Sequence, residues 1–123
     1  MNEHSIGIDT VNVNRIKNII DKYDKAFFKK IFTDLEVDYC QSKPHQFIHF
    51  AGKFAAKEAT KKALFSINEN FFVGFNKIEV CNNKSGMPFI KILSNEIVSS
   101  NINKIKVSIS HTDKIATSIV LIS

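Results

Sequence analysis

The chain has 123 residues and a formal net charge of +5, with 44% hydrophobic and 24% charged residues. This length predicts one domain over residues 1–123, and this composition excludes a disordered or low-complexity chain. The positive charge suits an anionic partner such as nucleic acid, a phosphate-rich cofactor or an acidic protein, without choosing among them.

The N-terminal segment has the pattern of a strand. Residues 5–13 alternate, so that Ile6 and Ile8 point to one face and Gly7 and Asp9 point to the other. We expect this strand to open the fold, with an acid on one of its faces.

The segment after this strand predicts three helical stretches. Isoleucines recur at helical spacing between residues 16 and 23, and an apolar cluster rich in phenylalanine follows at 27–32. Thr33 and Glu36 fit a capping box that opens another short helix. The strongest helical pattern covers residues 47–65, which are rich in alanine and lysine and contain no proline.

The second half of the chain predicts mainly strands and turns. The expected elements are a loop at 66–76, strands at 77–82 and 88–93, a short helix at 94–102, and strands at 104–110 and 115–122. This order predicts an α+β domain, in which an antiparallel sheet packs against one long and several short helices.

Targeting and redox signals are weak. The first residues lack the basic and then apolar pattern of a signal peptide, and no apolar run approaches the roughly 18 residues that cross a bilayer. We therefore expect a cytoplasmic protein with no membrane partner. Cys40 and Cys81 have no C-x-x-C spacing, which favours buried or idle thiols over a zinc site or a disulfide.

Asp9 is in an unusual place, because aspartate is depleted in strands. It shares a face with Gly7, which has no side chain and leaves room nearby. The local pattern leaves two interpretations open: Asp9 is a functional polar group, or it has a turn or cap role at a strand end.

Glu58 lies in an apolar sector of the long helix. At 100° per residue it falls between Phe54 and Phe65, whereas Lys53 and Lys57 occupy a different sector. A simple pair with Lys62, one turn later, is the structural alternative, and if exposed it would contribute only a few tenths of a kcal/mol. The pattern leaves a structural and a functional Glu58 equally open.

Two carboxylates from different elements suit a hard cation. Mg²⁺ prefers oxygen ligands and is typically held by one or two carboxylates together with substrate phosphates. Asp9 and Glu58 are the candidate ligands. Lysines on the same helix suit those phosphates as point charges, and they are Lys53, Lys57 and Lys62.

A histidine flanked by hydroxyl groups ends one of the last strands. Ser110, His111 and Thr112 stand where that strand passes into a turn, and such a histidine can donate to a phosphate or transfer a proton. The alternative is an ordinary surface turn histidine. P-loop, dinucleotide-binding and nucleophile-elbow motifs do not occur in the sequence.

Three segments together resemble the holo-acyl-carrier-protein synthases, which are the small 4′-phosphopantetheinyl transferases. The segments are Gly7-Ile8-Asp9 followed by Arg15-Ile16, residues 50–64 with a K-E-A-x-x-K core, and Val107 to Thr112. Their order and spacing match the family across nearly the whole chain.

This resemblance implies a reaction and its cofactors. The enzyme would move the phosphopantetheine arm of coenzyme A onto a serine of apo-acyl carrier protein and release adenosine 3′,5′-bisphosphate, in support of fatty acid biosynthesis. Asp9 and Glu58 would bind Mg²⁺ together with the pyrophosphate, and Lys62 and His111 would lie near the phosphates.

The resemblance also implies partners. Family members form homotrimers whose active sites lie between subunits, and their basic first helix meets the acidic carrier protein. Arg15, Lys17 and Lys22 would have that docking role. The turn that contains Gly86 and Pro88 is expected to border coenzyme A.

The sequence departs from the family pattern at three places. Lys53 stands where arginine is common, so a bidentate phosphate contact is lost there. Met87 stands where the turn usually has lysine, and residues 66–72 replace a glycine-rich loop. None of these three changes touches Asp9, Glu58, Lys62 or His111.

The expected mechanism is Mg²⁺-assisted phosphoryl transfer, with most of the rate coming from positioning and charge neutralisation. The carrier serine would attack the β-phosphorus of coenzyme A. Glu58, a water on the metal and His111 are all candidates to accept its proton, and the sequence does not choose among them.

Two other functions compete with this interpretation. A basic nucleic-acid-binding module without catalysis would explain the charge, but the phenylalanines occupy apolar periodic positions and no nucleic-acid-binding motif occurs, so we expect no nucleic acid. A catalytically inactive docking subunit is the second alternative, and the intact acid pair argues against it.

Overall fold

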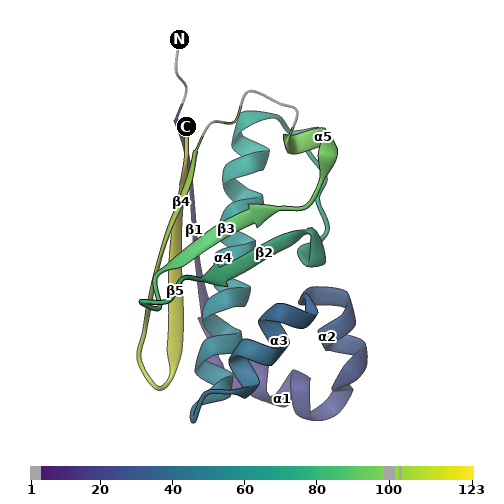
Figure 1. Ribbon diagram of the computed structural model, residues 1–123, viewed down its shortest axis with the longest axis vertical. Helices are drawn as coiled ribbons and strands as arrows, with labels where there is room; N and C mark the ends of the chain where they lie inside the picture. Colours follow the sequence, from purple (N-terminus) through teal and green to yellow (C-terminus); the bar gives the residue numbers. More distant parts are fainter. Residues whose placement is uncertain (1–3, 99–101, 103) are drawn as a thin grey trace.

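A long central helix organises the computed structural model (Figure 1), which describes residues 4–98, 102 and 104–123. The elements in chain order are β1 (Ser5–Asn12), α1 (Val13–Tyr23), α2 (Lys25–Ile31), α3 (Asp34–Gln41), α4 (Gln46–Ile67), the 3-10 turn η1 (Phe75–Lys77), β2 (Ile78–Asn82), β3 (Pro88–Ile92), α5 (Asn95–Val98), β4 (Ile105–His111) and β5 (Ile115–Ile122).

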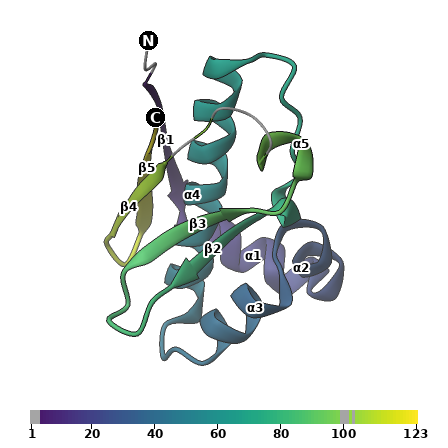
Figure 2. The same ribbon diagram turned by 45° about the horizontal axis from the view of Figure 1, so that its top comes forward.

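The strands form two antiparallel sheets in the described part of the chain. One has the order β1-β5-β4, and the other is the hairpin β2-β3. The α+β class and the packing of sheets against one long helix are confirmed, whereas the expected single sheet is divided in two. Figure 2 shows the short helices α1, α2 and α3 gathered at one end of α4, with the three-stranded sheet along its side.

Most element boundaries agree with the expectations. The helical segment after β1 is interrupted at Asp24, whose φ of 43° lies in the left-handed region, so α1 and α2 are separate helices. The side chain of Asn12 caps α1 by accepting a hydrogen bond from the Arg15 backbone N–H. The helix expected at 94–102 is observed over Asn95–Val98, and residues 99–101 lie outside the described residues.

A close approach between β1 and α4 determines where Asp9 lies. A Cβ atom added to Gly7 would lie 1.9 Å from the backbone oxygen of Ala59, so only glycine fits at this crossing. The alternation expected for this strand is confirmed, because Gly7 is buried against the helix whereas Ile6 and Ile8 are exposed. Asp9 shares the helix-facing side of β1.

The core forms two clusters along α4. One lies between the first half of α4 and the short helices, and the other lies between the second half of α4 and both sheets. Alanines supply much of the α4 surface in both clusters, which lets neighbouring elements pack close to its backbone. Among the described residues, no helix is both long enough and apolar enough to cross a membrane.

Candidate active site

A cavity of about 240 Å³ brings the two predicted acids together. Asp9 enters it from β1, Arg15 from α1, and Phe54 and Glu58 from α4. The sequence placed Glu58 beside Phe54 in an apolar sector, and this placement is confirmed. Asp9 lies in the middle of β1, opposite Ser118 of β5, so the turn or cap interpretation of Asp9 is wrong.

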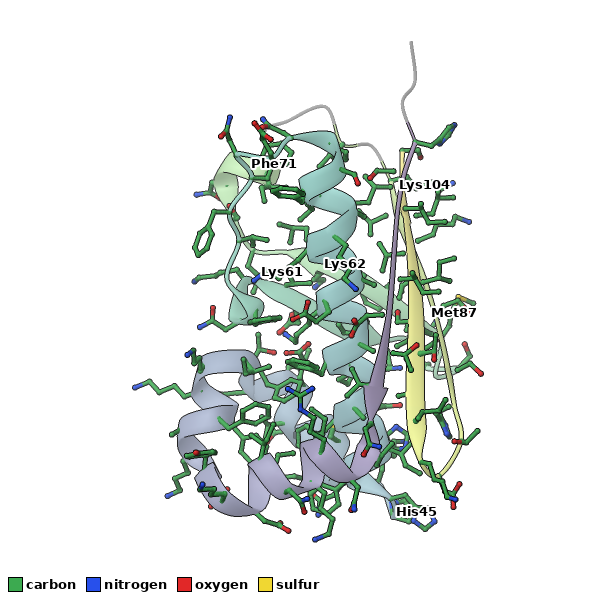
Figure 3. All side chains as sticks on the ribbon, turned by 180° about the vertical axis from the view of Figure 1, so that it is seen from behind. His45, Lys61, Lys62, Phe71, Met87 and Lys104 are labelled. Atoms are coloured by element: carbon green, nitrogen blue, oxygen red, sulfur yellow. The ribbon has the colours of Figure 1, made fainter. Side chains whose placement is uncertain are left out.

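Lys62 binds the strand that carries Asp9. Its Nζ atom donates to Asp9 Oδ1 at 3.1 Å and to the backbone oxygen of Ile8 at 2.9 Å. In Figure 3, Lys62 extends from α4 beside β1, whereas its neighbour Lys61 is directed to the other side of the helix. The ion pair that the structure describes for Lys62 is therefore with Asp9, across elements.

The donor set of this cavity fits a Mg²⁺ ion. Among the described residues, no three His, Cys, Asp or Glu side chains gather into a group able to hold a metal. The cavity itself is lined by two carboxylates, Asp9 and Glu58. Two carboxylates with room for water and phosphate oxygens match what Mg²⁺ requires, whereas a structural zinc or calcium site needs more protein ligands.

Lys57 has a different environment from the one expected. Its side chain is 0% exposed, and its ammonium group lies 2.7 Å from Glu36 Oε1. It also donates to the backbone oxygens of Phe75 and Ile78. All three ammonium protons have acceptors within the chain, so the predicted contact of Lys57 with a cofactor phosphate would require one of these bonds to break.

Glu36 completes this buried group. Its Oε1 atom accepts from the Thr33 backbone N–H, which forms the expected capping box of α3, and its Oε2 atom accepts from the Val80 backbone N–H. Burial lowers the pKa of Lys57, and the Glu36 carboxylate opposes that effect. The Lys57–Glu36 pair therefore connects α3, α4 and β2. Lys57 directly precedes Glu58 in α4.

Lys53 is also buried, on the same side of α4. Its Nζ atom donates to the backbone oxygen of Val80 and to Asn82 Oδ1, both at 2.7 Å, and lies 4.5 Å from the centre of the Tyr39 ring. Burial lowers its pKa. The structure therefore places the buried Lys53 ammonium against β2, and its contact with a cofactor stays a prediction.

The β2–β3 turn is connected to Lys53 through Asn82. The Asn82 side chain donates to the Gly86 backbone oxygen at 3.0 Å. Gly86 has a φ of 89°, which favours glycine, and nothing lies within 4 Å of the place where its Cβ would be. Pro88 begins β3 opposite Asn82. The turn that is predicted to border coenzyme A is thus exposed, and the Asn82 side chain supports its conformation.

His111 lies apart from the two acids. It ends β4, whereas Asp9 is in β1, and these are the opposite edge strands of the three-stranded sheet. The His111 ring contacts the His49 ring at a centroid distance of 6.5 Å, and His49 contacts Tyr39 at 6.0 Å. Burial lowers the pKa of His49, and the charge of His111 adds to this effect.

The hydroxyl groups beside His111 have different surroundings. Thr112 Oγ1 accepts from the backbone N–H groups of Lys114 and Ile115, both at 3.1 Å, so this side chain shapes the β4–β5 turn. Ser110 is exposed and pairs with Thr117 in the sheet register. His111 is therefore an exposed turn-end histidine in a single chain.

The basic residues of α1 lie on two sides of the helix. Arg15 and Lys22 line a second cavity beside the acid pair, and Arg15 borders both cavities. Lys17 projects in nearly the opposite direction, where it pairs with Asp21 at 2.6 Å and lies 5.4 Å from the Phe47 ring centre. The three residues therefore do not form one continuous surface.

Sequence reasoning missed the residues that support the site. The sequence identifies Glu36 only as part of a helix cap, and it does not single out Tyr39 or His49. The available signal was α4 itself, because alanine, glycine and threonine lie around the helix beside Lys53 and Lys57. Small residues on several sides indicate that this part of the helix is packed on several sides, but the same pattern does not distinguish the buried Lys53 and Lys57 from the exposed Lys62.

Comparisons with known proteins agree with this architecture. A family model described as the 4′-phosphopantetheinyl transferase superfamily matches residues 5–119. A holo-[acyl-carrier-protein] synthase of Halothermothrix orenii is 40% identical over 119 residues, which is 94% of each chain.

Solved structures give the same result. A holo-(acyl-carrier-protein) synthase from Bacillus anthracis, in complex with CoA (3′,5′-ADP), is 31% identical, with a TM-score of 0.76 and coverage of 96% of this chain and 94% of that one. A holo-[acyl-carrier-protein] synthase of Helicobacter pylori, in complex with coenzyme A, is 28% identical, with a TM-score of 0.81 and coverage of 96% and 99%.

Proposed function

Because the chain belongs to the holo-[acyl-carrier-protein] synthase family of the 4′-phosphopantetheinyl transferase superfamily, we propose that it transfers the 4′-phosphopantetheine group of coenzyme A to a serine of apo-acyl carrier protein. It is an enzyme of the phosphopantetheinyl transferase class. The observation that supports the proposed chemistry is that Asp9 and Glu58 line one cavity, with Lys62 bound to Asp9.

The proposed reaction exchanges one phosphorus–oxygen bond for another. The carrier serine oxygen attacks the β-phosphorus of coenzyme A and forms a bond to it. The bond from that phosphorus to the bridging oxygen breaks, and the bridging oxygen leaves with adenosine 3′,5′-bisphosphate. The serine proton passes to a base, and Glu58 is the candidate that lies in the acid cavity of the same chain.

Asp9 and Glu58 are the residues that would hold Mg²⁺. When bound, the ion would offset the negative charge that develops on the diphosphate during transfer. Arg15 and Phe54 line the same cavity, and the Phe54 ring would limit the access of bulk water to the reacting groups. Lys62 would add a positive charge at the edge of this cavity.

Assembly is part of the proposal, because the predicted residues lie in two separate regions of the chain. Asp9, Glu58 and Lys62 lie at the β1 edge, whereas His111 and the turn containing Gly86 lie on the far side of the molecule. The outer face of the sheet carries apolar cross-strand pairs that are strongly exposed, Ile6 with Leu121 and Ile8 with Ile119. We propose that copies of this chain cover that face in a homotrimer, so that each active site joins half-sites from two subunits.

Carrier docking is proposed for Arg15 and Lys22. Both face the cavity that adjoins the acid pair, so an acidic protein bound there would bring its serine close to Glu58. Lys17 is a weaker candidate, since Asp21 already neutralises it. The cytoplasmic location and the role in fatty acid biosynthesis stay predictions.

The nucleic-acid-binding alternative is not favoured. It depends on exposed lysines, whereas Lys53 and Lys57 are buried and paired. The family to which the chain belongs also accounts for a positive charge, since coenzyme A and acyl carrier protein are both anionic.

Mass spectrometry of the carrier protein tests the proposed function. Incubation with coenzyme A, Mg²⁺ and apo-acyl carrier protein should add one phosphopantetheine group, and chelation of divalent ions should prevent this. Glu58→Gln should lower the rate at least about a hundred-fold, whereas Glu69→Gln, an exposed change after α4, should not. An active Glu58→Gln variant would refute the assigned role.

Mixing variants tests the assembly. Glu58→Gln and His111→Ala each disable a different half-site. If active sites lie between subunits, mixed assemblies contain some sites with two intact halves, and activity should reappear when the two inactive proteins are combined. If activity does not recover although native mass spectrometry shows mixed trimers, both residues belong to sites within single subunits.

A further inference from the structure

Lys62 is bound to Asp9, the carboxylate that the proposed function assigns to a divalent cation. Its ammonium lies 3.1 Å from Asp9 Oδ1 and is also bound by the Ile8 backbone oxygen at 2.9 Å. Asp9 thus already has a cation beside it when the protein is free of ligands.

A divalent cation and this ammonium compete for the same group. An ion bound to Asp9 would place two positive charges next to the ammonium, and like charges at such short range repel strongly. The ammonium is held by one partly exposed ion pair and by one hydrogen bond to the Ile8 backbone oxygen, and exposed attachments of this kind are weak. Metal binding would therefore displace it.

The two lysines on successive turns of α4 differ in their freedom to move. Lys62 has a side chain that is 54% exposed, so it can rotate into solvent without losing packing. Lys57 is 0% exposed, and three acceptors fix its ammonium. Only Lys62 combines contact with Asp9 and room to leave it.

We propose that Lys62 is a place-holder cation, which neutralises Asp9 in the metal-free enzyme and is displaced when a divalent cation binds. The released ammonium is then free to meet an anion that enters the same cavity, so metal binding and anion binding assist each other. This inference rests on the proposed function, because it takes Asp9 and Glu58 as the metal-binding pair.

Binding of Mn²⁺ to the protein without coenzyme A, followed by electron paramagnetic resonance, tests the proposal independently of turnover. Lys62→Met removes the competing cation, so its affinity for Mn²⁺ should be about two- to five-fold higher than that of the natural protein. Lys61→Met is the matched control, because it removes the same charge from the same turn. The Lys61 ammonium lies 3.9 Å from the Phe75 ring centre and so contacts a different element.

A second measurement detects the displacement directly. In a titration with diamagnetic Mg²⁺, the side-chain methylene signals of Lys62 in a ¹H–¹³C spectrum should shift and should saturate together with metal binding. Signals of Lys61 should change little. The Lys62→Met variant identifies the Lys62 signals by their loss.

Each outcome supports or overturns the inference. Tighter Mn²⁺ binding in Lys62→Met than in Lys61→Met, with shifting Lys62 signals, supports it. Equal affinities in the two variants, or unchanged Lys62 signals at saturating Mg²⁺, overturn it and leave the metal site intact. If the natural protein and Glu58→Gln bind Mn²⁺ equally weakly, the proposed metal site itself is wrong and the place-holder role is overturned with it.

Discussion

The Lys57 ammonium lies 2.7 Å from the Glu36 carboxylate, and neither side chain is exposed. Glu36 lies in the first turn of α3 and accepts from the Val80 backbone N–H of β2, so one buried ion pair joins three elements. Because Glu58 follows Lys57 directly, this pair helps to set the rotation of α4 that places Glu58 in the same cavity as Asp9.

Breaking this pair from one side should be costly. Lys57→Met leaves the Glu36 carboxylate buried without its cation, and the free energy of unfolding should fall by about 3–5 kcal/mol. Urea unfolding followed by circular dichroism measures the change. Lys17→Met, which breaks the exposed pair with Asp21, should cost no more than about 1 kcal/mol.

The double variant Lys57→Met/Glu36→Gln separates burial from pairing. It removes both charges, so it should be more stable than Lys57→Met alone. A Lys57→Met protein as stable as Lys17→Met would contradict the assigned role of the buried pair.

Gly7 should not tolerate a methyl group. In Gly7→Ala the added Cβ would lie 1.9 Å from the Ala59 oxygen and 3.0 Å from the Ala63 nitrogen, both of which are backbone atoms of α4. The strand must move away from the helix, so we expect destabilisation of more than about 3 kcal/mol and displacement of Asp9. Thermal unfolding and Mn²⁺ binding report the two effects.

Gly74→Ala is the matched control for this prediction. Its added Cβ would meet only the Asn76 side-chain oxygen at 3.2 Å, and a side chain can rotate away. A Gly7→Ala protein no less stable than Gly74→Ala would show that β1 and α4 are less tightly apposed than described.

The positions of the acids could be predicted because each depends on a local period. Strand alternation put Asp9 on the face of Gly7, and helical periodicity put Glu58 beside Phe54. The burial of Lys57 could not be predicted in this way, because its partner Glu36 is on another helix and the charge pattern of α4 alone resembles a solvated face. The separation of His111 from Asp9 depends on the strand order, which no local pattern contains.

The cysteines should be unreactive in the folded protein. Both are free and buried, as the sequence predicted, and burial raises the pKa of Cys40 to about 12. Burial and the Glu79 carboxylate also raise the pKa of Cys81. Because the thiolate is the reactive form, alkylation by iodoacetamide near pH 8 should be very slow in the native state and should modify both thiols after denaturation. Rapid native labelling of Cys40 would contradict its burial between α3 and α4.

His49 should make the fold sensitive to acid. It faces His111 of β4, Tyr39 of α3, Lys43 and Lys53, and its pKa is lowered from 6.5 chiefly by burial and further by the positive groups around it. Because the unfolded chain then takes up a proton at a higher pH than the native chain, the free energy of unfolding falls as the pH drops through 6.5 toward the native pKa.

The His49→Phe variant isolates this contribution. Phenylalanine keeps a ring against Tyr39 but cannot take up a proton, so its stability relative to the natural protein should improve between about pH 7.5 and pH 5. Urea unfolding at several pH values gives the comparison, and His49→Gln, which is polar but does not titrate in this range, should show the same trend. Stability curves that stay parallel for all three proteins would mean that His49 is solvated, and that the Tyr39–His49–His111 contact does not persist in solution.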